Sequence, residues 1–283
     1  MYSYLLIGLL SILPQRLISR FVGFVVRLQL PRFMQIVANK LFVRAFSIDM
    51  SESKRPTNSF ASIEDLFIRE LRDGLRVARA SVCSPADGRL TISTPTQDPS
   101  GTFHIKGHKY SAAELVTGSA TGKLHSPLGW ASVVYLAPHN YHRVHSPVSG
   151  TLISARYIKG RLWPVIPAVV EKLPNLFSLN ERLVFDVKLS TGETSHIVMV
   201  GAMNVGRMLS LWLPDFVSNV TALPAFKEFA NINKEIRAGD ELGIFQLGST
   251  VVMLFPAKYV SQHSFVQLNM PRPIIVGEPI IAN

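Results

Sequence analysis

The order of apolar and polar positions divides the chain into an N-terminal part typical of helices and a longer part typical of strands. Up to about residue 47, runs of bulky apolar residues are interrupted by single arginines rather than by turn residues. The polar residues 49–58, with Pro56 among them, indicate a linker. A short amphipathic helix is predicted after it, because Ser62 is a suitable N-cap with Asp65 three residues further on.

From Val82 onward, short apolar runs alternate with Gly, Pro and Ser, a pattern that predicts strands. Residues 183–189 and 194–200 flank the sequence STGE and predict a β-hairpin. Residues 241–246 and 251–255 predict two further strands, with a break between them. The pattern therefore favours a mainly β second part.

A weak internal repeat supports this interpretation. The stretches SPADGRL at 84–90 and SPVSGTL at 146–152 share a serine, a proline, a glycine and a leucine. Each is typical of a turn that enters a strand. We therefore expect an α+β fold with N-terminal helices at residues 1–48, followed by a mainly β barrel or sandwich catalytic domain at residues 49–283.

One long segment fits neither pattern. Residues 160–182 are apolar but contain three prolines, which argue against a regular helix or a central strand. Such a segment either fills the core or covers a pocket of lipid size. We favour a lid.

Charge changes the interpretation of the N-terminal helices. The chain has a net charge of +10, and the residues before Asp49 include basic side chains but no acidic one. No apolar run reaches the roughly 20 residues that a membrane span needs. No basic segment precedes the first apolar run and no small-residue cleavage site follows it, so a signal peptide is not expected.

Amphipathic helices that lie in a membrane interface fit this composition. Arg16, Arg20 and Arg27 recur at i, i+4 and i+11, which places them on one helical face that we expect to oppose an anionic membrane surface. A buried helical hairpin is the alternative. Nucleic acid is not an expected partner, because the arginines alternate with aliphatic residues rather than with stacking aromatics.

Overall composition narrows the class of protein further. With 47% hydrophobic and 17% charged residues, the chain is not disordered. A single cysteine, Cys83, excludes an intramolecular disulfide framework and shows no metal-type spacing. We therefore expect a peripheral protein on the cytoplasmic side of the cell membrane.

Candidate chemistry is concentrated at three places in the β part. Ser249 stands at the break between two strands, Asp87 in the turn PADG, and two histidines, His142 and His145, in the sequence YHRVH. A serine, a histidine and an aspartate are the parts of an activated nucleophile. Because Gly248 directly precedes the serine, the nearest carbonyl that Ser249 could attack belongs to its own backbone.

These motifs together resemble the bacterial phosphatidylserine decarboxylases, which are made as proenzymes. The resemblance rests on five stretches in that family's order: PADG at 85–88, KGHKY at 106–110, YHRVH at 141–145, NLFSLNER at 175–182 and LGST at 247–250. It also covers the basic, apolar N-terminus. One difference is His139-Asn140, where the family usually has Arg-Asp, which removes a charge pair beside the site.

The resemblance implies that Asp87 orients His145 and that His145 deprotonates Ser249. The serine then attacks the carbonyl of Gly248 to give an ester in place of the peptide bond. Elimination across Ser249 leaves dehydroalanine, which hydrolyses to an N-terminal pyruvoyl group. The products are a β chain, 1–248, and an α chain, 249–283, which stay together as a heterodimer. No metal is implied.

The same resemblance implies that the pyruvoyl group made from Ser249 is the cofactor. Its ketone forms a Schiff base with the amine of phosphatidylserine, and loss of CO2 gives phosphatidylethanolamine. His142 is the candidate proton donor. In a strand, His142 and His145 would face opposite sides, whereas a turn would bring them together.

Three other interpretations compete with this one. A zinc-dependent hydrolase could use His142, His145 and Asp87 as ligands, although it would leave Ser249 without a role. A lipoyl- or biotinyl-like carrier would need a lysine at a hairpin tip, and none is evident. A membrane scaffold without activity would stay uncut.

Overall fold

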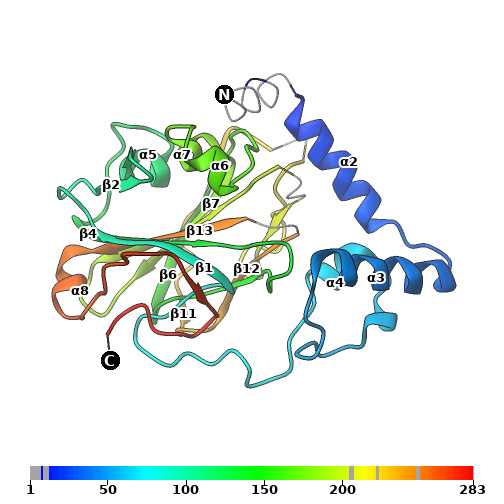
Figure 1. Ribbon diagram of the computed structural model, residues 1–283. Helices are drawn as coiled ribbons and strands as arrows, with labels where there is room; N and C mark the ends of the chain where they lie inside the picture. Colours follow the sequence, from blue (N-terminus) through cyan, green and yellow to red (C-terminus); the bar gives the residue numbers. More distant parts are fainter. Residues whose placement is uncertain (1–7, 9–12, 204–206, 221–222, 247–248, 283) are drawn as a thin grey trace.

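The computed structural model describes residues 8, 13–203, 207–220, 223–246 and 249–282. The fold is a mixture of α and β structure dominated by antiparallel sheets (Figure 1). Gly248, the proposed cleavage position, lies outside the described residues.

Within the described residues, nine strands form one twisted antiparallel sheet. Its strands run in the order β10 (Phe226–Phe229), β6 (Gly150–Ile158), β7 (Arg182–Lys188), β8 (Thr194–Val200), β13 (Thr250–Pro256), β4 (Leu128–Tyr135), β1 (Gly88–Pro95) and β14 (Arg272–Ile274), and β11 (Lys234–Ile236) also pairs with β6. In the described part, β10 and β14 end this order without pairing to each other, so the sheet is open. The expectation of a closed barrel is therefore wrong.

Smaller elements cover the sheet. A three-stranded sheet contains β5 (Arg143–His145), β12 (Glu241–Phe245) and β9 (Met208–Leu209). It approaches the large sheet closely at Gly243, where a β-carbon would lie 2.8 Å from the sulfur of Met199. Above the large sheet in Figure 1 lie α5 (Ala112–Thr117), α6 (Pro167–Val170) and α7 (Leu176–Leu179), with the hairpin of β2 (Thr102–Ile105) and β3 (His108–Ser111). The helix α8 (Ala257–Ser261) follows β13.

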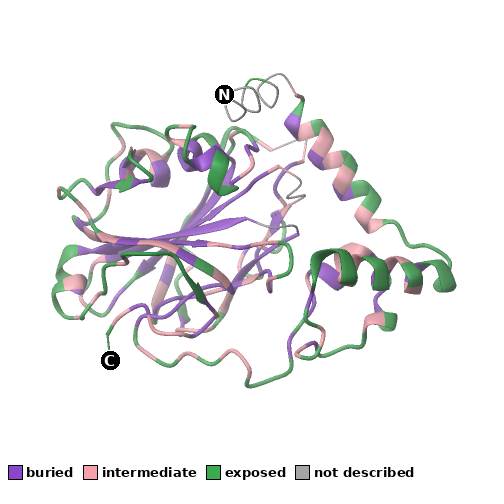
Figure 2. Ribbon diagram, in the orientation of Figure 1, coloured by how far each residue is buried: buried purple, intermediate pink, exposed green. Residues whose placement is uncertain are grey.

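Local patterns in the sequence determine most of these strands. The predicted hairpin is confirmed as β7 and β8, which pair in register from Arg182↔Val200 to Lys188↔Thr194. The two strands predicted around the break are confirmed as β12 and β13. Every residue of β13 is buried, because the strand lies in the middle of the sheet between β8 and β4 (Figure 2).

The internal repeat corresponds to two similar turns. In the first, the Ser84 hydroxyl donates to the carbonyl of Ala86 at 2.8 Å; in the second, the Ser146 hydroxyl donates to the carbonyl of Val148 at 2.6 Å. The glycines that follow begin β1 and β6. The predicted pair of turns that enter strands is confirmed.

The N-terminal part is helical where it is described. It contains α2 (Gln15–Arg27), α3 (Arg32–Phe46), the 3₁₀ turn η1 (Thr57–Ser59) and α4 (Ile63–Phe67). The hydroxyl of Ser62 accepts a hydrogen bond from the backbone N–H of Asp65 at 3.0 Å, so the predicted N-cap is confirmed. None of the helices in the described ranges combines the length and the apolar character that crossing a membrane requires.

The arginines of α2 differ from expectation, because they contact the protein rather than solvent. Arg16 forms an ion pair with Glu181 at 3.0 Å, Arg20 donates to the carbonyl of Asn219, and Arg27 lies 3.5 Å from a carboxylate oxygen of α4. They share one face, as their spacing predicts, but that face packs on the catalytic part. Large apolar side chains are exposed on both helices, together with three cations of α3, Arg32, Lys40 and Arg44. The apolar side chains are Leu17, Phe21, Phe24 and Val25 on α2, and Phe33, Met34, Val37, Leu41 and Phe46 on α3.

Candidate active site

Ser249 lies immediately before β13, at the edge of the break that follows β12. Its side chain is fully buried, and the hydroxyl has no hydrogen-bond partner among the described atoms. Its backbone carbonyl accepts a hydrogen bond from Leu136 N at 2.8 Å. The backbone is thus fixed, whereas a buried polar atom is left unpaired, which is uncommon in folded proteins and typical of functional groups.

His142 lies just before β5 and is also fully buried. Its Nδ1 is 2.8 Å from the carbonyl oxygen of Asn140, and its ring packs on Phe67 at 4.0 Å between centroids. Burial lowers the pKa of His142 to about 3, so the ring is neutral. Because a carbonyl can only accept, Nδ1 carries the proton. The other nitrogen, Nε2, is therefore a buried lone pair without a partner among the described atoms.

His145, at the end of β5, has a different environment. Its Nδ1 is 2.6 Å from the carbonyl oxygen of Gly239, and its Nε2 is 3.3 Å from the hydroxyl of Tyr141. Burial lowers the pKa of His145, while the bond to Gly239 and the charge of Glu241 act in the opposite direction. Its Nε2 accepts a proton only after the Tyr141 hydroxyl moves aside.

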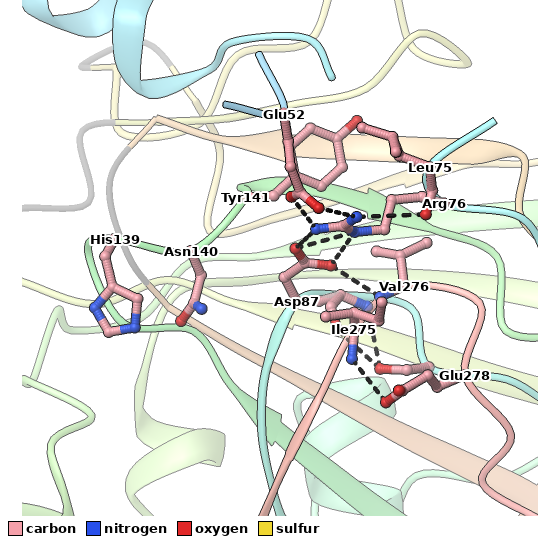
Figure 3. A network of polar contacts seen from close by, with 12 residues as sticks. Glu52, Leu75, Arg76, Asp87, His139, Asn140, Tyr141, Ile275, Val276 and Glu278 are labelled. Atoms are coloured by element: carbon pink, nitrogen blue, oxygen red, sulfur yellow. Dashed lines mark hydrogen bonds and ion pairs between the residues drawn. The ribbon is translucent and has the colours of Figure 1, made fainter. Parts of the chain in front are cut away.

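Asp87 is held by an arginine, as Figure 3 shows. Arg76 contacts both carboxylate oxygens of Asp87, with Nε–Oδ1 at 2.9 Å and Nη2–Oδ2 at 2.6 Å. Arg76 also binds Glu52, and the backbone N–H of Val276 donates to Asp87 Oδ1. Within the described residues, Asp87 makes no hydrogen bond to His145. The structure therefore places Asp87 near the histidine as a charge but not as its direct partner.

Strand register relates the two histidines to Ser249. The backbone N–H of Phe245 donates to the carbonyl of His142 at 3.0 Å, whereas His145 pairs with Glu241 at the other end of β12. His142 and His145 are three residue steps apart, which in an extended strand corresponds to about 10 Å. His142 therefore lies at the end of β12 that leads to Ser249, and His145 at the opposite end.

An apolar cavity of about 350 Å³ lies between the N-terminal helices and this site. Its wall comes from α2, α3, the end of β4, the proline-rich segment and the turn after β8: Val22, Val26, Phe42, Phe46, Tyr135, Leu136, Pro138, Pro164, Val165, Ile166, Ala202 and Met203. Leu136 connects it to Ser249, since its own backbone N–H donates to the serine carbonyl. The cavity thus lies between α2 and α3 and the residue that binds the backbone of Ser249.

The proline-rich segment packs into the core and also lines the apolar cavity. Trp163, Val169 and Phe177 are buried in the main core, so much of the segment fills space over the sheet. Pro164 and Ile166 line the apolar cavity. The expected lid stays a prediction.

The zinc interpretation finds no support in this geometry. No group of three or more His, Cys, Asp or Glu side chains suited to a metal ion occurs among the described residues. Asp87 is occupied by Arg76, and the two histidine rings have separate partners.

Three residues beside the site, Arg69, Arg76 and Tyr141, were given no role from the sequence. Arg76 binds Asp87 from a linker without a motif. Tyr141 is part of YHRVH, but its contact with His145 depends on the turn before β5. Arg69, which follows α4, donates to the carbonyl of His139 at 3.2 Å. Only Tyr141 could have been suspected, from its place in the motif.

Similarity to known proteins defines the class. The family model described as phosphatidylserine decarboxylase matches residues 63–282. Curated proteins named phosphatidylserine decarboxylase proenzyme are similar along almost their whole length. That of Acidovorax ebreus (strain TPSY) is 35% identical over 94% of this chain and 93% of its own. The Myxococcus xanthus protein is 34% identical over 92% of each, and that of Pseudomonas aeruginosa 34% over 94% and 93%.

These similarities define the class of the protein as a carboxy-lyase. The chain belongs to the phosphatidylserine decarboxylase family. The resemblance seen in the five sequence motifs is confirmed.

Proposed function

We propose that this chain is a phosphatidylserine decarboxylase proenzyme that cuts itself between Gly248 and Ser249. The observation that carries the proposal is the Ser249 hydroxyl at the break between β12 and β13, which is buried and has no partner among the described atoms. A serine that served only as a turn residue would be hydrogen-bonded or solvated. An unpaired one is available to attack the preceding carbonyl.

In the proposed self-cleavage, His145 takes the proton of Ser249. Its Nδ1 proton is donated to Gly239, which leaves Nε2 as the basic atom. His145 pairs with Glu241, at the end of β12 away from Ser249, so the histidine and the serine have to be brought together before the proton moves. Catalytic hydrogen bonds are often loose before reaction. The products are a β chain, 1–248, and an α chain, 249–283.

Residues around Ser249 fit a self-derived pyruvoyl group. The position is buried, so water is excluded, and the present hydroxyl engages no neighbour that would have to be displaced. When present, such a group supplies an electrophilic ketone for an amine and accepts the electrons released with CO2. The rest of the chemistry is proton transfer by side chains of the chain.

We assign that transfer to His142. An ammonium group must lose a proton before its nitrogen can attack, and the lone pair on Nε2 of a neutral imidazole can take it. The same nitrogen can return the proton to carbon after CO2 leaves. Packing against Phe67 and the hydrogen bond to Asn140 hold the ring in one orientation during both steps.

The lipid substrate, phosphatidylserine, fits the apolar cavity beside Leu136. An acyl chain lying there would extend from Ser249 toward the exposed apolar sides of α2 and α3. Those sides would lie in the membrane interface. We therefore place the enzyme at the membrane surface as a peripheral protein, on the cytoplasmic side, with its two chains as a heterodimer.

Intact mass of the purified protein tests the proposal. Two fragments that divide at residues 248 and 249, with a blocked N-terminus on the smaller one, are expected together with CO2 release from phosphatidylserine vesicles. Ser249→Ala should remain one chain and release none. A full-length wild-type chain that is active without cleavage would overturn the proposal.

A further inference from the structure

Arg69 is a buried cation without a carboxylate partner. Its side chain is 4% exposed. Nη2 donates to the carbonyl of His139, whereas Nε and Nη1 are buried and have no hydrogen-bond partner among the described atoms. A guanidinium has five N–H donors and stays protonated. Leaving a buried charge unpaired is costly, so an anion from outside the chain is the expected partner.

Acidic groups near Arg69 are all engaged elsewhere. Asp87, Asp49 and Glu52 act on it electrostatically, against the burial that lowers the pKa of Arg69. Arg76 binds two of these carboxylates, and the third, Asp49, accepts the backbone N–H of Ser51 at 2.8 Å. None forms an ion pair with Arg69 in the described part of the chain.

The segment from Leu136 to His142 links Arg69 to the reaction centre. It contacts Ser249 at Leu136 and Arg69 at His139, and it ends at the candidate proton carrier. Phe67, two residues before Arg69, packs on the His142 ring. A ligand group bound at Arg69 would therefore lie along the same loop as the reacting groups.

Space for an anionic group adjoins this arginine. A polar cavity of about 400 Å³ is lined by Lys54, Arg55, Asp65, Ile68, Arg69, Glu70 and Arg143. Two of its cations are neutralised, since Arg55 pairs with Asp65 and Arg143 with Glu241. The apolar cavity lies by the same loop, at Leu136 and Pro138. Polar and apolar spaces on one loop suit a lipid with an anionic headgroup.

We propose that Arg69 binds the phosphodiester of the lipid substrate through the guanidinium N–H groups for which the described part of the chain offers no partner. This inference rests on the proposed decarboxylase function. The substrate carries a second anion, its carboxylate, but that charge disappears as CO2 leaves. An arginine bound to it would stabilise the starting state and slow the reaction. The phosphodiester keeps its charge throughout, so binding it adds affinity without such a cost.

The test compares Arg69→Gln and Arg69→Lys with the control Arg72→Gln. Arg72 is exposed and donates to the carbonyl of Ser51, so its loss should change nothing. Two ligands separate the anions: glycerophosphoethanolamine has a phosphodiester and no carboxylate, and L-serine has the reverse. Both carry an amine. Binding to the purified, self-cleaved protein is measured by calorimetry, and kcat and KM are measured with phosphatidylserine vesicles.

Arg69→Gln should weaken glycerophosphoethanolamine binding and raise KM by about 10- to 100-fold, with a smaller change in kcat and unchanged L-serine binding. Arg69→Lys should lie between this variant and the wild type. Weakened L-serine binding alone would assign Arg69 to the carboxylate and overturn the proposal, as would unchanged binding of both ligands.

If Arg69→Gln does not fold, Arg69→Lys still decides the question. The wild type should bind a neutral phosphotriester analogue at least about 10-fold more weakly than the diester, and the lysine variant should lose most of this discrimination. Equal discrimination would overturn the proposal. A wild type that releases no CO2 would instead contradict the proposed function.

Discussion

Val276 donates its backbone N–H to Oδ1 of Asp87 at 2.9 Å, across 189 residues of sequence. A residue proposed for self-cleavage thus also binds the segment that cleavage would separate from it. Arg76 fixes the same carboxylate from the other side. Asp87 therefore has a structural role in addition to its proposed electrostatic one.

Processing should depend on Ser249, His145 and Asp87. Ser249→Ala should give one uncut band, because the nucleophile is gone, and His145→Ala and Asp87→Ala should cut much more slowly. Asp87→Ala should also destabilise the fold by about 3 kcal/mol, since it leaves Arg76 partly unpaired in a buried position. Gel analysis and urea unfolding measure the two effects.

The exposed Asp73 supplies the matched control, and Asp73→Ala should change neither cleavage nor stability by much. Normal self-cleavage in His145→Ala would remove the assignment of the base. Because Asp87 does not contact His145 directly, Asp87→Asn separates its roles: the amide oxygen can still accept from Val276, but the charge is lost.

His142 should matter for turnover rather than for cleavage. His142→Ala should still divide into two chains and should still be trapped with substrate by borohydride. Its turnover should fall by roughly 10²- to 10⁴-fold, the usual contribution of a positioned general acid. His104→Ala, at an exposed histidine, is the control. A His142→Ala variant that does not cleave itself would assign His142 to self-cleavage instead. The position of His142, at the end of β12 that leads to Ser249, would fit that role.

Acid should unfold the protein partly through His142. Its pKa is about 3 when buried and 6.5 in its ordinary state, so below pH 6.5 the unfolded chain binds a proton that the native ring does not. Stability is then full above pH 6.5 and falls as pH decreases toward 3, by up to about 1.4 kcal/mol per pH unit from this residue. The free energy of unfolding, measured by chemical unfolding at pH 7 and pH 5, should decrease less between these two values in His142→Gln than in the protein with His142. An unchanged slope would mean that the ring is protonated in the native state.

Membrane binding should depend on apolar side chains of α2 and α3. Phe24→Ser with Phe33→Ser should weaken liposome binding at least about 10-fold, because both rings are exposed and would lie in the interface. Removal of residues 1–45 should abolish binding if the remainder folds. Val77→Ser, at an exposed valine of a linker, is the control.

Salt should have a smaller effect on this binding than the six cations before Asp49 suggest, because three arginines of α2 bind the protein. Full binding of the truncated chain would contradict the assignment. In that case the segment around Trp163 would be examined next.

Elements with a local cause could be predicted from the sequence. The hairpin of β7 and β8 follows from alternation and a turn, and the N-cap of α4 follows from Ser62 and Asp65. Sheet closure could not be predicted, because the same strands can form an open or a closed sheet, and register between distant strands decides between them.

The candidate site shows the same division. The residue types of Ser249, His142 and His145 identified the chemistry, but the distant partner of His145, the carbonyl of Gly239, could not be predicted. The spacing of Arg16, Arg20 and Arg27 fixed one face of a helix, yet the sequence does not say which face another part of the chain covers. Arg69 lacked any motif, and only its burial without a carboxylate partner identifies it.

The central position of β13 has a consequence for the lifetime of the protein. Cleavage before residue 249 would make this strand the start of a separate 35-residue chain, counted from 249 to 283, while it remains hydrogen-bonded between β8 and β4. A strand in that place can be inserted while the chain is continuous, but a detached fragment would have to find its slot in a collapsed sheet. Unfolding of the mature protein would then be practically irreversible. The durability of the mature form would be governed by its rate of unfolding. The free energies of unfolding expected for the Asp87 and His142 variants are therefore those of the uncleaved chain, in the Ser249→Ala background.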